Sequence, residues 1–311
     1  MWNLLKPVLS CELNHVEKAV QGQIGIYVCA TDNMKIAANI DSASGSFEKV
    51  LRYLPPMMNQ LTIPMMIIGL EPFETFKISE KAEVIRTDLV LDVVERNKLQ
   101  NVDEIDTLVD VLASAIGAPT NPTKISKTFK SERGITYSNK TISNHIEYLT
   151  QSFLISKASR YDIKGRKYVG ANQKYYFTDI GLRNARLNFR QQEPTHIIEN
   201  IVYNELLIRG YNVDIGIVEV YGKNEEGKTI RKQLEIDFVV NQGSKRYYIQ
   251  VAYDMSSEEK QAQEFNSLRN ISDSFKKIVI VNGTKKPWRN DEGFVIMGMK
   301  YFLLNDDSLE F

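Results

Sequence analysis

Two short apolar segments near the C-terminus carry the side chains best suited to chemistry. Asp237 lies in residues 234–240, and Gln250 lies in residues 247–253. Both segments have the composition of β-strands and are joined by turn residues 241–244, so we expect Asp237 and Gln250 on neighbouring strands. Carboxylate and amide oxygens are ligands that Mg²⁺ and Mn²⁺ accept in proteins.

A further carboxylate comes from a helix expected over residues 195–209, whose apolar residues recur at helical spacing. Its Glu199 completes a candidate site for a divalent metal with Asp237 and Gln250. These three residues are also the candidates for catalysis, because phosphodiester cleavage needs a metal held by oxygen ligands. The alternative is that Glu199 and Asp237 are structural carboxylates at a helix start and a strand end.

Cleavage also needs a group that activates water, usually a lysine, and residue 252, two positions after Gln250, is an alanine. A lysine from another element could replace it. The candidates are Lys232, Lys245 and Lys260. A lysine ammonium within about 5 Å of the cluster would favour a nuclease over a binding protein.

The middle of the chain is basic, although the whole chain carries 39 Lys and Arg and 39 Asp and Glu. Residues 121–190 contain 14 Lys and Arg and four Asp and Glu, a local net charge of +10. Such a concentration of cations is typical of a surface that neutralises phosphates. It favours double-stranded DNA as a partner.

The same segment shows the pattern of a winged helix. Helices are expected over 103–116 and 123–132, and Ser138 is expected to cap a third helix with a buried stripe of Ile142, Ile146 and Leu149. Strands expected at 153–161 and 174–177 would form the wing. The residues expected to contact DNA lie on the third helix and the wing: Lys140, Asn144, Arg160, Lys164, Arg166 and Lys167. Winged helices also bind proteins, and Glu147 on the exposed face is unfavourable for DNA.

Several segments resemble the C-terminal domain of unknown function of the predicted prokaryotic AAA-type ATPases. Including segments upstream of this domain, the resemblance covers about two-thirds of the chain. It rests on Glu199-Asn200 and on residues 204–206, 209–213, 235–238, 248–253, 174–183 and 88–96. It implies a C-terminal fold similar to restriction endonucleases, which place an Asp on one strand and Glu-X-Lys on the next. The sequence Gln250-Val251-Ala252 at that position is typical of the ATPase family, so the resemblance implies an inactive nuclease-like domain.

Members of that family normally begin with a phosphate-binding loop, Gly-x-x-x-x-Gly-Lys-Ser/Thr. This sequence contains no such motif. Residues 35–41 and 47–51 resemble the metal-binding strand and following helix of such an ATPase, but Ser42 follows Asp41 where the family has Glu. We therefore interpret residues 1–80 as either a truncated ATPase remnant or an unrelated segment, and we expect no ATP hydrolysis.

Composition indicates a globular protein, with 43% hydrophobic and 25% charged residues. The two cysteines allow no disulfide framework, and the longest apolar stretch, residues 61–70, is too short to cross a bilayer. The first residues lack the features of a secretory signal. We therefore expect a cytoplasmic protein that does not bind membranes.

The predicted fold is α/β and α+β, a winged helix followed by a restriction-endonuclease-like α/β sandwich. The expected domains are 1–80, 81–190 and 195–311. The leading function is DNA or partner binding. The alternatives are a metal-dependent nuclease with a migrated lysine, using Mg²⁺ or Mn²⁺, and a protein-interaction module.

Overall fold

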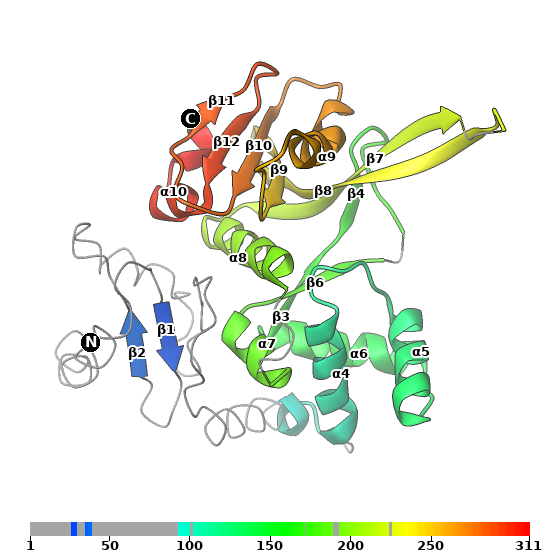
Figure 1. The fold of residues 1–311 in the computed structure, drawn as a ribbon. Coiled ribbons are helices and arrows are strands. Elements are labelled where there is room, and N and C mark those ends of the chain that lie inside the picture. The colour runs from blue at the N-terminus through cyan, green and yellow to red at the C-terminus, as the bar shows by residue number, and fades with distance from the viewer. Residues whose placement is uncertain are drawn as a thin grey trace. The chain divides into compact units, whose positions relative to one another are not determined.

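The computed structural model describes strands β1 Ile26–Cys29 and β2 Lys35–Ala38 and residues 93–99, 102–170, 172–188, 193–223 and 226–311 (Figure 1). β1 and β2 pair antiparallel. The other residues of the segment 1–80, which we interpreted as an ATPase remnant, lie outside the described residues. The chain divides into a helical unit, Met1–Ser114, Pro122–Ser156 and Phe177–Gln192, and a sheet unit, Ala115–Asn121, Lys157–Tyr176 and Glu193–Phe311.

The helical unit contains α4 Val102–Ser114, α5 Pro122–Arg133, α6 Asn139–Gln151 and α7 Ile180–Arg186. The first three confirm the expected helices. The Ser138 hydroxyl accepts a hydrogen bond from the backbone N–H of Thr141, as an N-cap does. Ile142, Ile146 and Leu149 are buried, so the predicted stripe of α6 is also confirmed.

Two buried arginines of α7 attach this helix to α4. Arg186 donates to Asp106 at 2.6 Å and to Asp110 at 2.8 Å. Arg183 is fully buried and donates to the backbone carbonyl of Ala113 at 2.9 Å. Because a buried guanidinium needs acceptors for its donors, these contacts fix the position of α7 on α4.

The sheet unit is built on an eight-stranded mixed sheet with the order β11-β12-β10-β9-β8-β7-β4-β5. Its bounds are β4 Arg160–Asp162, β5 Lys167–Tyr168, β7 Asn212–Lys223, β8 Thr229–Gln242, β9 Lys245–Ala252, β10 Lys276–Val281, β11 Trp288–Arg289 and β12 Val295–Gly298. β9, β10 and β12 run parallel, whereas β7, β8 and β9 are successively antiparallel. The strands expected at 234–240 and 247–253 are present as β8 and β9, and β8 is longer than predicted.

The predicted wing differs from the structure. β3 Ile155–Ala158 and β6 Lys174–Phe177 pair in a two-stranded sheet, as the wing requires. The chain between them, however, forms the β4–β5 hairpin, and β4 pairs in parallel with β7. The expected wing-tip residues Lys164, Arg166 and Lys167 therefore belong to the sheet unit. Sequence pattern could not show this, because β4 and its partner lie more than 50 residues apart.

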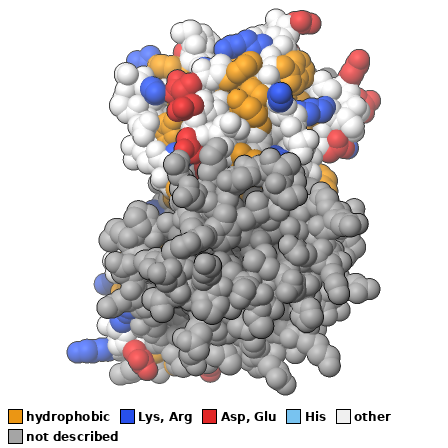
Figure 2. Space-filling view, turned by 90° about the vertical axis from the view of Figure 1, so that its left-hand side faces the viewer, with side chains coloured by type: hydrophobic (Ala, Val, Ile, Leu, Met, Phe, Trp, Pro, Cys, Tyr) orange, Lys and Arg blue, Asp and Glu red, His pale blue; other side chains and the backbone are white. Residues whose placement is uncertain are grey.

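Helices α8 Pro194–Ile208, α9 Glu258–Arg269 and α10 Met299–Leu304 and the short η1 Ser308–Glu310 accompany the sheet. Among the residues that the structure describes, none of the helices has the length and apolar character to cross a membrane. On the face shown in Figure 2, the described surface mixes hydrophobic, basic and acidic side chains.

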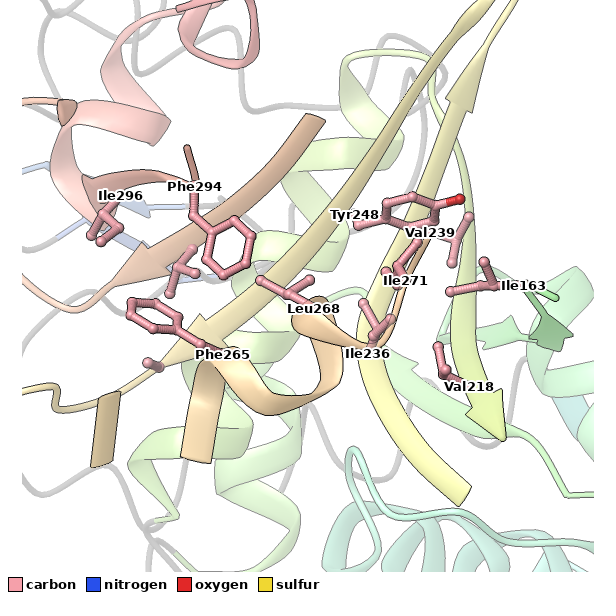
Figure 3. Close-up of a cluster of buried hydrophobic side chains, with 12 residues drawn as sticks. Ile163, Val218, Ile236, Val239, Tyr248, Phe265, Leu268, Ile271, Phe294 and Ile296 are labelled. Carbon is pink, nitrogen blue, oxygen red and sulfur yellow. The ribbon is translucent and has the colours of Figure 1, made fainter. Parts of the chain in front are cut away.

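α9 covers one face of the sheet. Its Phe265 and Leu268 lie in a buried cluster with Tyr248 of β9 and with Ile236 and Val239 of β8 (Figure 3). Side chains alternate across a regular strand, so residues three apart should face opposite ways. Ile236 and Val239 share a face because β8 is irregular between them.

The irregularity is a β-bulge. The register of β7 and β8 shifts between Asp214 and Gly216, so that Asp237 and Phe238 together stand opposite Ile215. Both side chains consequently leave the α9 face. The bulge places Asp237 among the residues described next.

Candidate functional site

A buried lysine joins the predicted carboxylates. Lys174 Nζ lies 2.9 Å from Glu199 Oε1 and 2.7 Å from Glu235 Oε1, and its side chain is 4% exposed. The Tyr176 hydroxyl donates to the same Glu199 oxygen at 2.6 Å. Together with Asp237 and His196, we call these residues the Lys174 cluster.

Three elements of the sheet unit position the cluster. β6 supplies Lys174 and Tyr176, which are two residues apart and therefore on one side of the strand. α8 supplies the buried Glu199, and β8 supplies Glu235. Tyr176 also stacks on Tyr203 of α8, with ring centroids 4.2 Å apart. The cluster is thus held by ion pairs and by aromatic packing.

The charges in the cluster stabilise one another. Burial alone would lower the pKa of Lys174, but the attraction of the surrounding acidic side chains, Glu199 first, outweighs burial and raises that pKa above its ordinary value. Burial would likewise raise the pKa of Glu199, but Lys174 and the hydrogen bonds from His196 and Tyr176 lower it. Lys174 is therefore charged and Glu199 ionised at neutral pH.

His196 approaches Glu199 from the first turn of α8, with Nδ1 3.5 Å from Oε2. Hydrogen bonding to Glu199 raises the pKa of His196. Gly117 lies behind the imidazole with φ of +67°, and a Cβ there would lie 2.7 Å from His196 Nδ1. A side chain at position 117 would therefore be both strained and in collision with the cluster.

Asp237 is buried at the bulge. Its Oδ2 accepts a hydrogen bond of 2.8 Å from the backbone N–H of Val251. Burial, followed by the nearby charge of Glu199, raises its pKa well above the usual range. Burial thus favours the neutral form of Asp237, whereas a carboxylate that binds a metal must be ionised.

Gln250 does not reach the cluster, contrary to the expectation that it joins Glu199 and Asp237 as a metal ligand. Gln250, Tyr248 and Ala252 alternate along β9 and share the α9 face. Gln250 Oε1 accepts from the Ser267 hydroxyl of α9 at 3.4 Å. The bulge is the reason, because in a regular register Asp237 would stand opposite Gln250 on the same face.

The lysines expected to migrate into the site lie elsewhere. Lys245 pairs with Glu310, and Lys260 pairs with Asp254. Lys232 is exposed on β8. The lysine that reaches the cluster is Lys174, which we had assigned only to a wing strand. Its signal in the sequence was a single cation at the start of Lys174–Phe177, a strand that is otherwise aromatic and buried.

The described residues do not fit a divalent metal. Within them, no three His, Cys, Asp or Glu side chains come together as a possible metal site. One oxygen of Glu199 already accepts from Lys174 and Tyr176, and Gln250 faces away. A divalent ion beside Glu199 and Glu235 would also face repulsion from the ammonium, which is strong at low dielectric. The ammonium supplies the positive charge that these carboxylates require.

The residues expected to bind DNA are divided between the two units. Lys140 and Asn144 are exposed on α6 of the helical unit. Arg160, Lys164, Arg166 and Lys167 lie on the β4–β5 hairpin of the sheet unit. Arg160 Nη2 donates to Gln233 Oε1 at 3.3 Å, and Lys164 Nζ donates to the Glu219 carbonyl at 3.1 Å.

Three families match successive parts of the chain. Residues 1–70 match restriction endonuclease BglII/BglIII, and residues 73–193 and 195–302 match two different domains of unknown function, DUF8612 and DUF4143. The nuclease similarity thus covers a segment of which the structure describes only β1 and β2, whereas Glu199 and Asp237 lie in the third match. None of the matches is to an ATPase, so the interpretation of residues 1–80 as an ATPase remnant stays a hypothesis.

An uncharacterized protein of Haemophilus influenzae is 30% identical over 273 residues, which cover 88% of this chain and 62% of that relative. The chain therefore spans less than two-thirds of the length of this relative. The crystal structure of protein VC1899 from Vibrio cholerae is 14% identical, with 79% of this chain and 64% of that chain covered. Its TM-score of 0.24 gives no ground for assigning a shared fold.

Proposed function

We propose that this protein binds double-stranded DNA and does not cleave it at the Lys174 cluster. The observation that carries the proposal is the buried ammonium of Lys174 between Glu199 and Glu235. A nuclease of the restriction-endonuclease type needs carboxylates free to hold a metal. Here an internal cation satisfies them, while Asp237 prefers to be neutral.

DNA is the proposed ligand because of the helical unit and the N-terminal similarity. α4, α5 and α6 follow the order of a winged helix, and β3 and β6 supply a pair of strands for its wing. The exposed face of α6 carries Lys140 and Asn144, a phosphate-binding and a base-reading side chain. The match of residues 1–70 to a restriction endonuclease family is consistent with a role on DNA.

A salt titration of duplex binding in the presence of Mg²⁺ tests both halves of the proposal. The logarithm of the binding constant should fall linearly with the logarithm of salt concentration, and Lys140→Ala should reduce that slope by about one unit. Asn144→Ala should cost about 1–3 kcal/mol on a preferred sequence. Lys98→Ala, an equal loss of charge at an exposed lysine outside α6, is the control.

Supercoiled plasmid should remain intact under the same conditions with Mg²⁺ or Mn²⁺. If Lys140→Ala and Lys98→Ala have equal slopes, α6 does not carry the contact. Nicking by the wild-type protein that disappears in Asp237→Asn would reject the claim that the cluster is inactive.

The second candidate is a metal-dependent nuclease in which Lys174 is the migrated lysine. Its Nζ lies 2.9 Å from Glu199 Oε1, well within the distance that favours this alternative. It requires Lys174 to leave its ion pairs when metal binds. Nicking that is lost in both Lys174→Met and Asp237→Asn would support it.

The relation to AAA-type ATPases is a separate hypothesis. Calorimetry with Mg²⁺-ATP should show no saturable heat, because the chain lacks a phosphate-binding loop. A micromolar site would reject that expectation.

A further inference from the structure

Strands β7 and β8 extend beyond the rest of the sheet (Figure 1). Pairing of β4 with β7 ends at Ile217, and pairing of β9 with β8 ends at Phe238. Beyond these positions, residues 218–223 and 229–234 pair only with each other among the described strands. We call this two-stranded ribbon the β7–β8 arm.

The two faces of the arm differ in chemistry. Directly opposed residues of an antiparallel pair share a face, and Tyr221 stands opposite Arg231. Lys223, two residues from Tyr221, lies on the same face. The other face carries Lys232 opposite Val220. The face with Tyr221, which is 69% exposed, thus presents Lys223 and Arg231, together with Glu219, which pairs with Arg231.

The face with Tyr221 leads to the Lys174 cluster. Arg231, Gln233 and Glu235 alternate along β8 and share this face. Gln233 accepts from Arg160, and Glu235 forms the ion pair with Lys174. A continuous polar track therefore runs from the exposed arm to the buried carboxylates.

We propose that this face of the β7–β8 arm binds a single-stranded segment of DNA. Arg231 and Lys223 would contact phosphates, and an unpaired base would stack on Tyr221. Arg231 is held at the surface by an ion pair with Glu219, which leaves further guanidinium donors for a phosphate. An exposed aromatic ring beside cations is an arrangement that binds single strands, since stacking requires a base that is not already paired. The proposal deepens the proposed DNA binding and rests on it.

Adjacent residues on opposite faces provide a matched test. Arg231→Gln and Lys232→Gln remove one charge each at neighbouring positions of β8, so only the face differs. Anisotropy of a fluorescein-labelled single strand of about 15 nucleotides, with the full-length protein, measures the effect. We expect Arg231→Gln to weaken binding at least 3-fold and Lys232→Gln to stay within 2-fold of wild type. Tyr221→Ser should weaken binding about 5- to 150-fold, and Tyr221→Phe should retain it.

Equal losses in Arg231→Gln and Lys232→Gln, or no loss in Tyr221→Ser, would overturn the proposal. Thermal unfolding of each variant checks that these exposed substitutions leave the fold intact. Lys140→Ala with duplex DNA separates this proposal from the preceding one. If Lys140→Ala weakens duplex binding while the arm variants bind the single strand normally, the arm proposal fails and DNA binding through α6 stands. If the wild-type protein binds neither probe, both proposals fail.

Discussion

Replacing Lys174 with methionine would remove the ammonium that pairs with both Glu199 and Glu235 in the Lys174 cluster. Methionine fills a similar volume, so the substitution removes charge rather than packing. Glu199 would keep its bonds from Tyr176 and His196 but lose the ammonium at 2.9 Å. Glu235, whose side chain is 32% exposed, would lose its partner at 2.7 Å but could be hydrated.

The magnitude follows from the burial of Glu199, whose side chain is 6% exposed. Removing one partner of a buried ion pair costs about 3–5 kcal/mol, because the remaining charge has lost both water and its counter-ion. We expect Lys174→Met to lower the free energy of unfolding of the sheet unit by this amount at pH 7. For comparison, Lys260→Met breaks an exposed pair with Asp254, so it should leave the free energy of unfolding nearly unchanged.

The effect should depend on pH. In the wild type the pKa of Glu199 is lowered by its partners, so its contribution to stability is present above the unfolded pKa of about 4.3 and is lost as pH falls through the lower folded pKa. In Lys174→Met, burial dominates and raises the pKa of Glu199, so the stability of the variant falls as pH rises. The difference between the two proteins should therefore be largest near neutral pH and should shrink toward pH 4.

Urea unfolding of wild type, Lys174→Met and Lys260→Met at pH 4.5, 6 and 7.5 measures this prediction. Glu199→Gln in the Lys174→Met background should recover part of the loss, since it removes the uncompensated charge. If Lys174→Met lies within about 1 kcal/mol of wild type at pH 7.5, the ion pair does not stabilise the cluster as argued. A loss that is constant across the pH range would contradict the electrostatic explanation.

Three further substitutions test other features by urea or thermal unfolding. Asp237→Asn keeps an acceptor for the N–H of Val251 but cannot ionise. It should therefore be about 1–3 kcal/mol more stable than wild type at pH 8, with a smaller gain at pH 5. An unchanged pH profile would show that Asp237 ionises freely. Arg186→Met should destabilise the helical unit by about 2–4 kcal/mol, and no loss would show that α7 is held by packing alone. Gly216→Ala should cost about 1–3 kcal/mol, because its Cβ would lie 2.9 Å from Ile236 Cβ; an unaffected variant would show that the bulge can relax.

Local sequence pattern predicted most of the elements. The apolar stripe of Ile142, Ile146 and Leu149 and the cap at Ser138 gave α6 its position. These features depend on residues a few positions apart, so the chain determines them before it folds. The same reasoning selected Glu199 and Asp237 as candidate site residues, and both are buried.

Tertiary structure decided which side chains meet. A bulge of one residue on β8 turned Asp237 away from the α9 face, on which Gln250 lies, and left Asp237 with Glu199. Strand pairing across more than 50 residues placed the β4–β5 hairpin on the sheet and made it part of the sheet unit. β6 brought Lys174 to acids 25 and 61 residues further along the chain. The sequence determines which residues are buried and ionisable, because burial follows local pattern. The partner of each charge depends on strand register and on contacts between distant segments, and no local pattern encodes these.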